Sequence, residues 1–252
     1  MLDGAFIRSL ALRPPADGEP ERCGHPWRLP VVRALEQPLA LHANVTFLVG
    51  ENGSGKSTLI EALAVAAGMN PEGGSSNFAF STRPEEGSFA DALRLVRGVK
   101  RPRTDFFLRA ESVFNAATYL ERLKREDPYG ETTFDSYGGT SLHEQSHGES
   151  FLAIVVNRFG GSGLYLLDEP EAALSVQNCM TLLRRIDELV ADGSQFVIAT
   201  HSPVVLAYPD ATIYCLSDDG IEAIPYDEAP PVRLMRAFLN EPGAFVRRLM
   251  ED

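Results

Sequence analysis

A run of residues that begins at Gly50 has the composition and spacing needed to bind phosphate groups. It fits the pattern G-x-x-x-x-G-K-[ST] at every fixed position: Gly50-Glu51-Asn52-Gly53-Ser54-Gly55-Lys56-Ser57-Thr58. The glycines let successive backbone N–H groups point at one anion, and the start of a following helix adds partial positive charge. Lys56 is expected to reach the outer phosphates, and the Ser57 hydroxyl to bind Mg²⁺. The run therefore predicts that residues 51–58 bind a nucleotide.

Two carboxylates end an apolar run further along the chain. Asp168 and Glu169 directly follow residues 163–167. An acidic residue at the end of a buried strand, downstream of a phosphate loop, usually makes the second Mg²⁺ contact, through water. We therefore predict a metal role for Asp168 beside Ser57, and a role for Glu169 in polarising the water that attacks the γ-phosphate. The alternative is an acidic turn that caps the next helix; the apolar run and the upstream loop favour the metal role.

Strand-like and helix-like segments alternate around these residues. Apolar runs predict strands at 45–49, 163–168 and 195–201, and periodic segments predict helices at 59–67 (ended by Gly68), 151–159 and 172–190. A hairpin at 211–216 and 221–224 and two short helices at 231–239 and 242–250 close the chain. Continuous apolar strands indicate a mainly parallel sheet covered on both faces. The phosphate loop, Asp168 and His201 then meet at one sheet edge.

The remaining segments are less regular. Residues 5–12 and 27–35 are predicted to form an antiparallel pair of strands before the core. A short helix at 89–96, a strand at 104–110 and a helix at 112–125 follow. We therefore expect a single α/β domain over 1–252, with a small helical insertion at about 69–147. Trp27, the one tryptophan, either packs or stacks on an adenine ring, and packing is favoured.

Composition narrows the class of protein. The formal net charge of −12 argues against avid, sequence-independent binding to nucleic acid, which needs many lysines and arginines, and the small basic clusters at 100–103 and 122–125 are typical of solvated faces. The three cysteines form no C-x-x-C pair and suggest neither disulfides nor a metal site. Neither a membrane-spanning run nor a signal peptide is evident, so we expect a cytoplasmic protein.

With these residues assembled, the chain resembles the ABC-type ATPases, and more narrowly the small bacterial predicted AAA-family members. The chromosome-maintenance ATPases are more distant relatives. In this resemblance Gly50–Ser57 is the Walker A loop, Leu164–Glu169 is Walker B with its catalytic glutamate, and Ala172–Ser175 is the D-loop. His201 matches the switch histidine that contacts the γ-phosphate. The resemblance implies an ATPase that uses ATP and Mg²⁺, with Glu169, His201 and Lys56 as catalytic residues.

The resemblance also gives a role to a four-residue segment whose sequence alone would be a weak signal. Ser146-His147-Gly148-Glu149 stands where the family carries its signature sequence, about twenty residues before Walker B. In the family this segment binds ATP held by a second subunit, which implies a head-to-tail homodimer with ATP between the subunits. Two departures stand out. Ser175 replaces the usual D-loop aspartate, and the Q-loop glutamine is missing, with Glu111 (near Arg109) as its candidate replacement.

Three kinds of function remain open at this point. The chain is either an ATPase that acts on an unknown protein partner, or a nucleotide switch that hydrolyses ATP slowly. A role as a transporter ATPase subunit is less well supported, because the Q-loop glutamine is missing. A place in DNA repair or defence rests on distant analogy only.

Overall fold

The central element is a six-stranded sheet with the order β5-β6-β7-β3-β8-β9. The computed structural model describes residues 4–15, 22–71, 73–74, 88–110 and 147–251. The sheet strands are β3 (Val45–Gly50), β5 (Thr104–Arg109), β6 (Gly163–Asp168), β7 (Gln195–Ala199), β8 (Thr212–Ser217) and β9 (Gly220–Ile224). All neighbours run parallel except β8 and β9, which form the predicted hairpin. The predicted mainly parallel α/β fold is confirmed.

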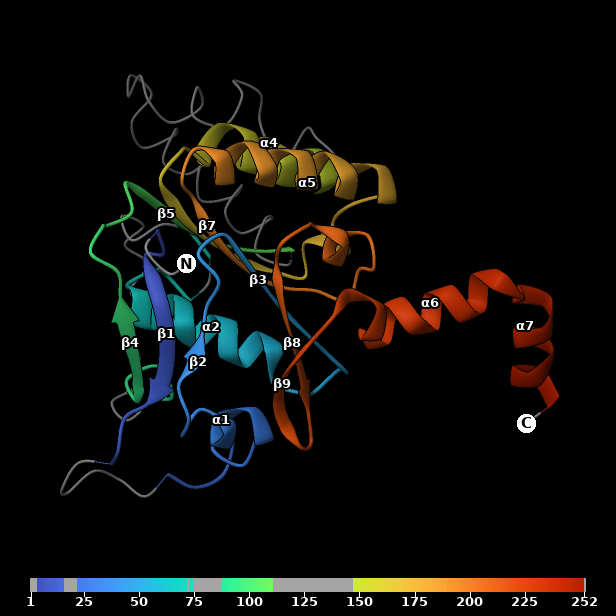
Figure 1. The fold of residues 1–252 in the computed structure, drawn as a ribbon, viewed down its shortest axis with the longest axis horizontal. Coiled ribbons are helices and arrows are strands. Elements are labelled where there is room, and N and C mark those ends of the chain that lie inside the picture. The colour runs from blue at the N-terminus through green and yellow to red at the C-terminus, as the bar shows by residue number, and fades with distance from the viewer. Residues whose placement is uncertain (1–3, 16–21, 72, 75–87, 111–146, 252) are drawn as a thin grey trace, which may run out of the picture.

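Helices cover both faces of this sheet, because alternate side chains of each strand point opposite ways. Phe47 of β3 packs toward α4 (His147–Arg158) and α5 (Val176–Ala191), whereas Leu48 packs toward α2 (Lys56–Ala67). Figure 1 shows the same arrangement, with α4 and α5 on one side of the sheet and α2 on the other. The helix α2 ends at Gly68, whose φ of 99° is the left-handed conformation that glycine adopts readily.

A second, three-stranded sheet lies beside α2. Its order is β2-β1-β4, with β1 at Ile7–Leu12, β2 at Leu39–Ala40 and β4 at Leu93–Arg97, and both pairings are antiparallel. The fully buried amide of Gln195 joins the two sheets. It accepts hydrogen bonds from the backbone N–H groups of Phe6 and Ile7 at 2.9 and 3.0 Å, and it donates to the carbonyls of Ile7 and His42 at 2.8 and 2.9 Å.

Two of the predicted elements are wrong. Residues 27–35 form a turn followed by the helix α1 (Pro30–Ala34), not a strand. Proline fits the first position of a helix, where its missing N–H is not needed, and it cannot donate to a strand ladder. Residues 89–96, predicted as a helix, form a turn and then β4, which pairs with β1. The antiparallel partners of β1 are therefore β2 and β4.

The predicted helical insertion at 69–147 contains regular parts of both sheets. Within that range, β4 belongs to the three-stranded sheet and β5 is an edge strand of the central sheet. The helix predicted at 112–125 and the residues Glu111 and Ser146 lie outside the described residues.

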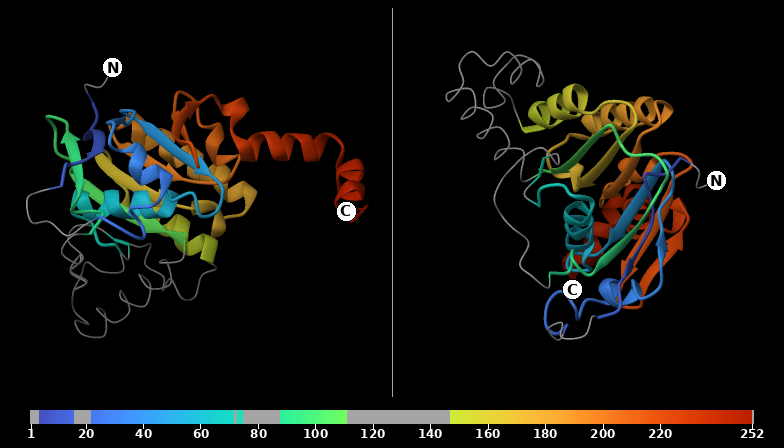
Figure 2. Two further views of the ribbon diagram at one scale, coloured as in Figure 1. Left: turned by 90° about the horizontal axis from the view of Figure 1, so that it is seen from below. Right: turned by 90° about the vertical axis from the view of Figure 1, so that its left-hand side faces the viewer.

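The chain ends in the helices α6 (Pro230–Asn240) and α7 (Pro242–Glu251), as predicted. They extend away from the body of the molecule, and the T-shaped contact between Phe238 and Phe245, with ring centroids 5.7 Å apart, joins them (Figures 1 and 2). Three short 3₁₀ turns complete the described elements: η4 (Pro170–Ala172), η5 (Val205–Ala207) and η6 (Tyr226–Glu228). Over the described ranges, no helix is long and apolar enough to cross a membrane.

Candidate nucleotide-binding site

The predicted phosphate loop connects β3 to α2, as its sequence context requires. A Cβ atom on Gly50 would lie 2.4 Å from the Leu216 carbonyl oxygen and 2.7 Å from Ser54 Oγ, so only glycine fits. Gly53 and Gly55 have φ values of 84° and 92°, in the left-handed region that side chains disfavour. These three glycines therefore set the shape of the loop. Because α2 begins at Lys56, its N-terminal N–H groups open toward the loop.

The Lys56 side chain is buried against its own loop. Its Nζ atom donates hydrogen bonds to the backbone carbonyls of Gly50 and Glu51, both at 3.0 Å. Burial lowers the pKa of Lys56, and the nearby carboxylates, led by Glu169, act in the opposite direction. A cation held at this point is ready to exchange its carbonyl partners for phosphate oxygens, which are stronger acceptors.

Ser57 and Asp168 lie together, as the two predicted metal-binding residues should. The Ser57 hydroxyl donates to Asp168 Oδ1 at 3.1 Å, and Arg109 Nε lies 3.4 Å from Asp168 Oδ2. Burial raises the pKa of Asp168 to about 6, against the opposing effects of Arg109 and Ser57. A hydroxyl and a carboxylate side by side are the hard oxygen ligands that Mg²⁺ prefers, with water and phosphate oxygens filling the remaining positions. The residues present therefore fit Mg²⁺.

We expect the variant Asp168→Asn to be more stable than the wild type at pH 8 when Mg²⁺ is absent. The folded-state pKa of about 6 exceeds the ordinary value of 3.8, so the ionised carboxylate destabilises the fold above pH 6. Removing that charge should raise the free energy of unfolding by roughly 1–3 kcal/mol. The advantage should shrink as the pH falls through 6 and vanish below 3.8.

Thermal unfolding in EDTA over this pH range measures the effect of Asp168→Asn. The exposed turn residue Asp218 supplies the matched control, and Asp218→Asn should leave the unfolding curve unchanged at every pH. An Asp168→Asn protein that is less stable than the wild type at pH 8 would contradict the argument.

Glu169 and His201 face each other at the same sheet edge. Glu169 has a φ of 48°, which is strained for a residue with a side chain, and strain of this kind gathers at functional sites. Its Oε1 lies 3.5 Å from His201 Nε2. That distance and alignment give an electrostatic contact and not a hydrogen bond, so Nε2 is buried without a hydrogen-bond partner among the described residues. It is available to a ligand such as a phosphate oxygen.

The predicted signature segment lies on a different part of the fold. Ser146 and the His147 side chain are outside the described part of the chain, and Glu149 is exposed in the first turn of α4. Gly148 packs so closely on the next segment that an added Cβ would lie 2.9 Å from the Ala173 carbonyl oxygen. The helix α4 covers the face of the sheet opposite to α2 (Figure 1).

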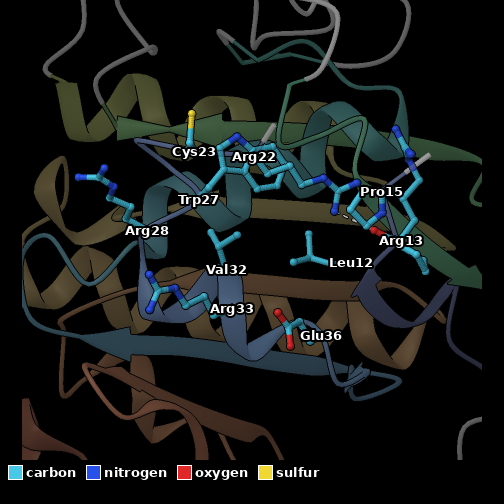
Figure 3. Close-up of a pocket in the computed structure, with 11 residues that line it drawn as sticks. Leu12, Arg13, Pro15, Arg22, Cys23, Trp27, Arg28, Val32, Arg33 and Glu36 are labelled. Carbon is cyan, nitrogen blue, oxygen red and sulfur yellow. Dashed lines mark hydrogen bonds between the residues drawn. The ribbon is translucent and has the colours of Figure 1, made fainter. Parts of the chain in front are cut away.

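Trp27 lines a cavity of about 600 Å³ between the end of β1 and α1 (Figure 3). Its ring packs edge-on against Phe89 with centroids 5.8 Å apart, and the Arg22 guanidinium lies 5.1 Å from its centroid. Trp27 therefore has packing contacts, the role that the sequence favoured over stacking on an adenine ring. The other charged residues of the cavity wall are Arg13, Arg28, Arg33 and Glu36.

Two residues of the site were not given roles from the sequence. Arg109 links Asp168 to Glu61, whose Oε2 it reaches at 3.0 Å, and Glu171 binds the backbone of His201. Arg109 ends β5 directly opposite Asp168 in the register of β5 and β6. The position of Arg109 at the end of a predicted strand was the one signal in the sequence. Its contact with Asp168 could not be predicted, because the sequence alone does not say which strands are neighbours.

The topology and the phosphate loop together define a P-loop ATPase fold of the ABC-like class. More narrowly, the chain belongs to the family described as "AAA domain, putative AbiEii toxin, Type IV TA system", which matches residues 45–111 and 110–207, more than half of the chain. Protein McbF of Escherichia coli is 25% identical over 187 residues, which are 69% of this chain and 71% of that protein.

Two solved structures are similar at the level of the fold. The cbiO1 component of the cbiONQ ABC transporter complex of Clostridium perfringens is 16% identical, with a TM-score of 0.43 and coverage of 85% of this chain and 90% of that chain. The SMC head domain of Thermotoga maritima is also 16% identical, with a TM-score of 0.43 and coverage of 87% and 98%. Both likenesses are loose, so the class rests on the topology, the motifs and the family match.

Proposed function

We propose that the protein hydrolyses ATP in an Mg²⁺-dependent reaction at the edge where β3, β6 and β7 end. The observation that carries this proposal is the convergence of three groups from distant parts of the chain. Lys56 is a buried cation on the phosphate loop. The Ser57 hydroxyl lies 3.1 Å from Asp168. Glu169 and His201 face each other at 3.5 Å. In the proposed reaction the first group binds phosphate and the second binds Mg²⁺. The third pairs a general base with a residue that contacts the γ-phosphate.

The chemistry requires positioning and charge stabilisation, with no covalent intermediate. Lys56 and the N–H groups of residues 51–58 bind the phosphates, and Ser57 and Asp168 hold Mg²⁺. When bound, Mg²⁺ neutralises charge on the phosphate oxygens. Glu169 accepts a hydrogen bond from the attacking water and orients it in line with the γ-phosphate. His201 donates its ring N–H to a γ-phosphate oxygen and steadies the charge that develops there.

A second subunit would complete each site. This step is supported by the position of Gly148 at the start of α4, because α4 packs on the face of the sheet opposite to α2, the helix that begins at the phosphate loop. We propose a head-to-tail homodimer in which residues 146–149 of one subunit bind the γ-phosphate held by residues 50–58 of the other. Closing and reopening of this dimer would act on a partner. The net charge of −12 favours a protein partner over nucleic acid, which is itself negatively charged.

Mixing two inactive variants tests both the ATPase and its shared site. Lys56→Ala removes the phosphate ligand, and Gly148→Asp places a negative charge in the signature segment. Neither protein alone should release phosphate from ATP. In an equal mixture, half of the dimers are mixed and each has one intact site, so about a quarter of the wild-type rate should return.

The mixing experiment has clear failing outcomes. Lack of phosphate release by the wild type, together with tight ATP binding by calorimetry, would replace the ATPase with a nucleotide switch. An active wild type whose variants do not complement each other would contradict the shared site alone. Thermal unfolding must show that Gly148→Asp is folded, because its side chain meets the Ala173 carbonyl.

A further inference from the structure

Glu171 binds the main chain of the turn that carries His201. Its Oε1 accepts a hydrogen bond from the His201 backbone N–H at 2.5 Å, and its Oε2 accepts from the Thr200 hydroxyl at 2.7 Å. Thr200 is fully buried, and its hydroxyl oxygen in turn accepts from the Ser202 N–H at 3.0 Å. One carboxylate thus fixes the three consecutive residues that present the imidazole.

The backbone N–H of His201 is held by the Glu171 side chain and not by a hydrogen bond to a neighbouring strand. β7 ends at Ala199, whose carbonyl accepts from the Glu169 N–H at 2.9 Å, and the Thr200 N–H still reaches the Leu48 carbonyl at 3.1 Å. Beyond this point the ladder stops, and the N–H groups of His201 and Ser202 are satisfied by side chains. The position of His201 therefore depends on a side chain 30 residues away in sequence.

The charges and hydrogen bonds around Glu171 indicate that it holds the turn of His201 and is not simply part of an acidic turn. With Asp168 and Glu169, it is one of three carboxylates that act on the buried charge of Lys56. A carboxylate makes no attractive contact with an anionic nucleotide, so nucleotide binding does not by itself explain Glu171. A capping role would need no hydrogen bonds to the turn after β7, yet both Glu171 oxygens accept hydrogen bonds from the two residues that directly follow that strand.

We infer that Glu171 is a positioning residue for the ATPase reaction and that it acts through His201. This inference rests on the proposed function, because His201 matters only if it meets a γ-phosphate. Glu169 and Glu171 lie two residues apart on one turn, so the turn that carries the base also fixes the histidine that faces it. The separation of 3.5 Å between Glu169 and His201 is set by this pair of contacts.

Replacing Glu171 should lower kcat and leave the KM for ATP nearly unchanged. Glu171→Ala frees the His201 turn, and a misplacement of about 1 Å in a site of this kind costs up to roughly 100-fold in rate. We expect kcat to fall between about 10-fold and 100-fold, with KM within about threefold, because Lys56 and the loop still bind the phosphates. Glu171→Gln keeps an oxygen for the His201 N–H and should recover most of the lost rate.

The experiment combines phosphate release with an NMR signal that needs no nucleotide. The amide proton of His201 should lie downfield in the wild type, because it bonds to a carboxylate, and should move upfield in Glu171→Ala and less so in Glu171→Gln. Glu222→Ala removes an exposed glutamate on β9 and serves as the control for both measurements. A purely structural role would lower the melting temperature of Glu171→Ala without separating kcat from KM.

Two results would overturn the inference while leaving the proposed ATPase intact. The first is an active wild type whose kcat is unchanged in Glu171→Ala. The second is a loss of kcat in Glu171→Ala while the His201 amide signal stays where it is in the wild type. Absence of phosphate release by the wild type itself is a different result, and it would remove the proposed function.

Discussion

Substituting Glu169 by glutamine should nearly abolish ATP hydrolysis while ATP binding persists. Glutamine has the same shape, so it preserves the unusual backbone φ of 48° and the 3.5 Å approach to His201. It cannot accept a proton from the attacking water, and loss of a general base typically costs about 10²–10⁴-fold in rate. The dissociation constant for ATP should stay within a few-fold, since Lys56 and the loop are unchanged.

The same variant should accumulate as an ATP-bound dimer. Without hydrolysis there is no step that reopens the proposed sandwich, so light scattering with ATP and Mg²⁺ should report twice the monomer mass. Glu222→Gln, the same substitution at an exposed position on β9, should behave as the wild type in both assays. If Glu169→Gln releases phosphate at the wild-type rate, Glu169 is not the base.

The substitution Lys56→Ala should remove ATP binding itself. Lys56 is a buried cation at the start of α2 that can give two hydrogen bonds to phosphate oxygens. At about 1.5–3 kcal/mol for each bond, the loss of both should lower the affinity at least about 100-fold. Calorimetric titration with ATP and Mg²⁺ measures the change directly. The wild-type affinity in this variant would show that phosphates do not bind at the loop.

The matched control for this variant is Lys100→Ala, an exposed lysine between β4 and β5. It changes the net charge by the same amount and should leave ATP affinity unchanged. Thermal unfolding is also needed, because Lys56 donates to the Gly50 and Glu51 carbonyls in the nucleotide-free protein. The Glu51 carbonyl lies on a loop with exposed residues, where water can replace the lysine, but the Gly50 carbonyl is buried, so the melting temperature should fall modestly.

Much of the fold could be predicted from local patterns. The strand at β3, the helix α2 with its stop at Gly68, and the hairpin of β8 and β9 all follow from apolar runs, helical periodicity and glycine positions. Of the two errors, the one at 27–35 missed a local signal, the proline at the start of α1, and the other fell where a tertiary contact overrides local preference. Residues 93–96 were predicted to be part of a helix, and they form most of β4 because β1 offers an antiparallel edge.

For the site, the sequence by itself determined the groups that bind phosphate and metal, because the loop at 50–58 and the strand that ends at Asp168 are short segments with their own chemistry. Only the tertiary structure decided how these groups are linked to each other. Arg109 reaches Asp168 because β5 and β6 are neighbours in register, and Glu171 reaches His201 because the ends of β6 and β7 meet at one edge. Contacts between residues far apart in the chain depend on strand order, which no local pattern records.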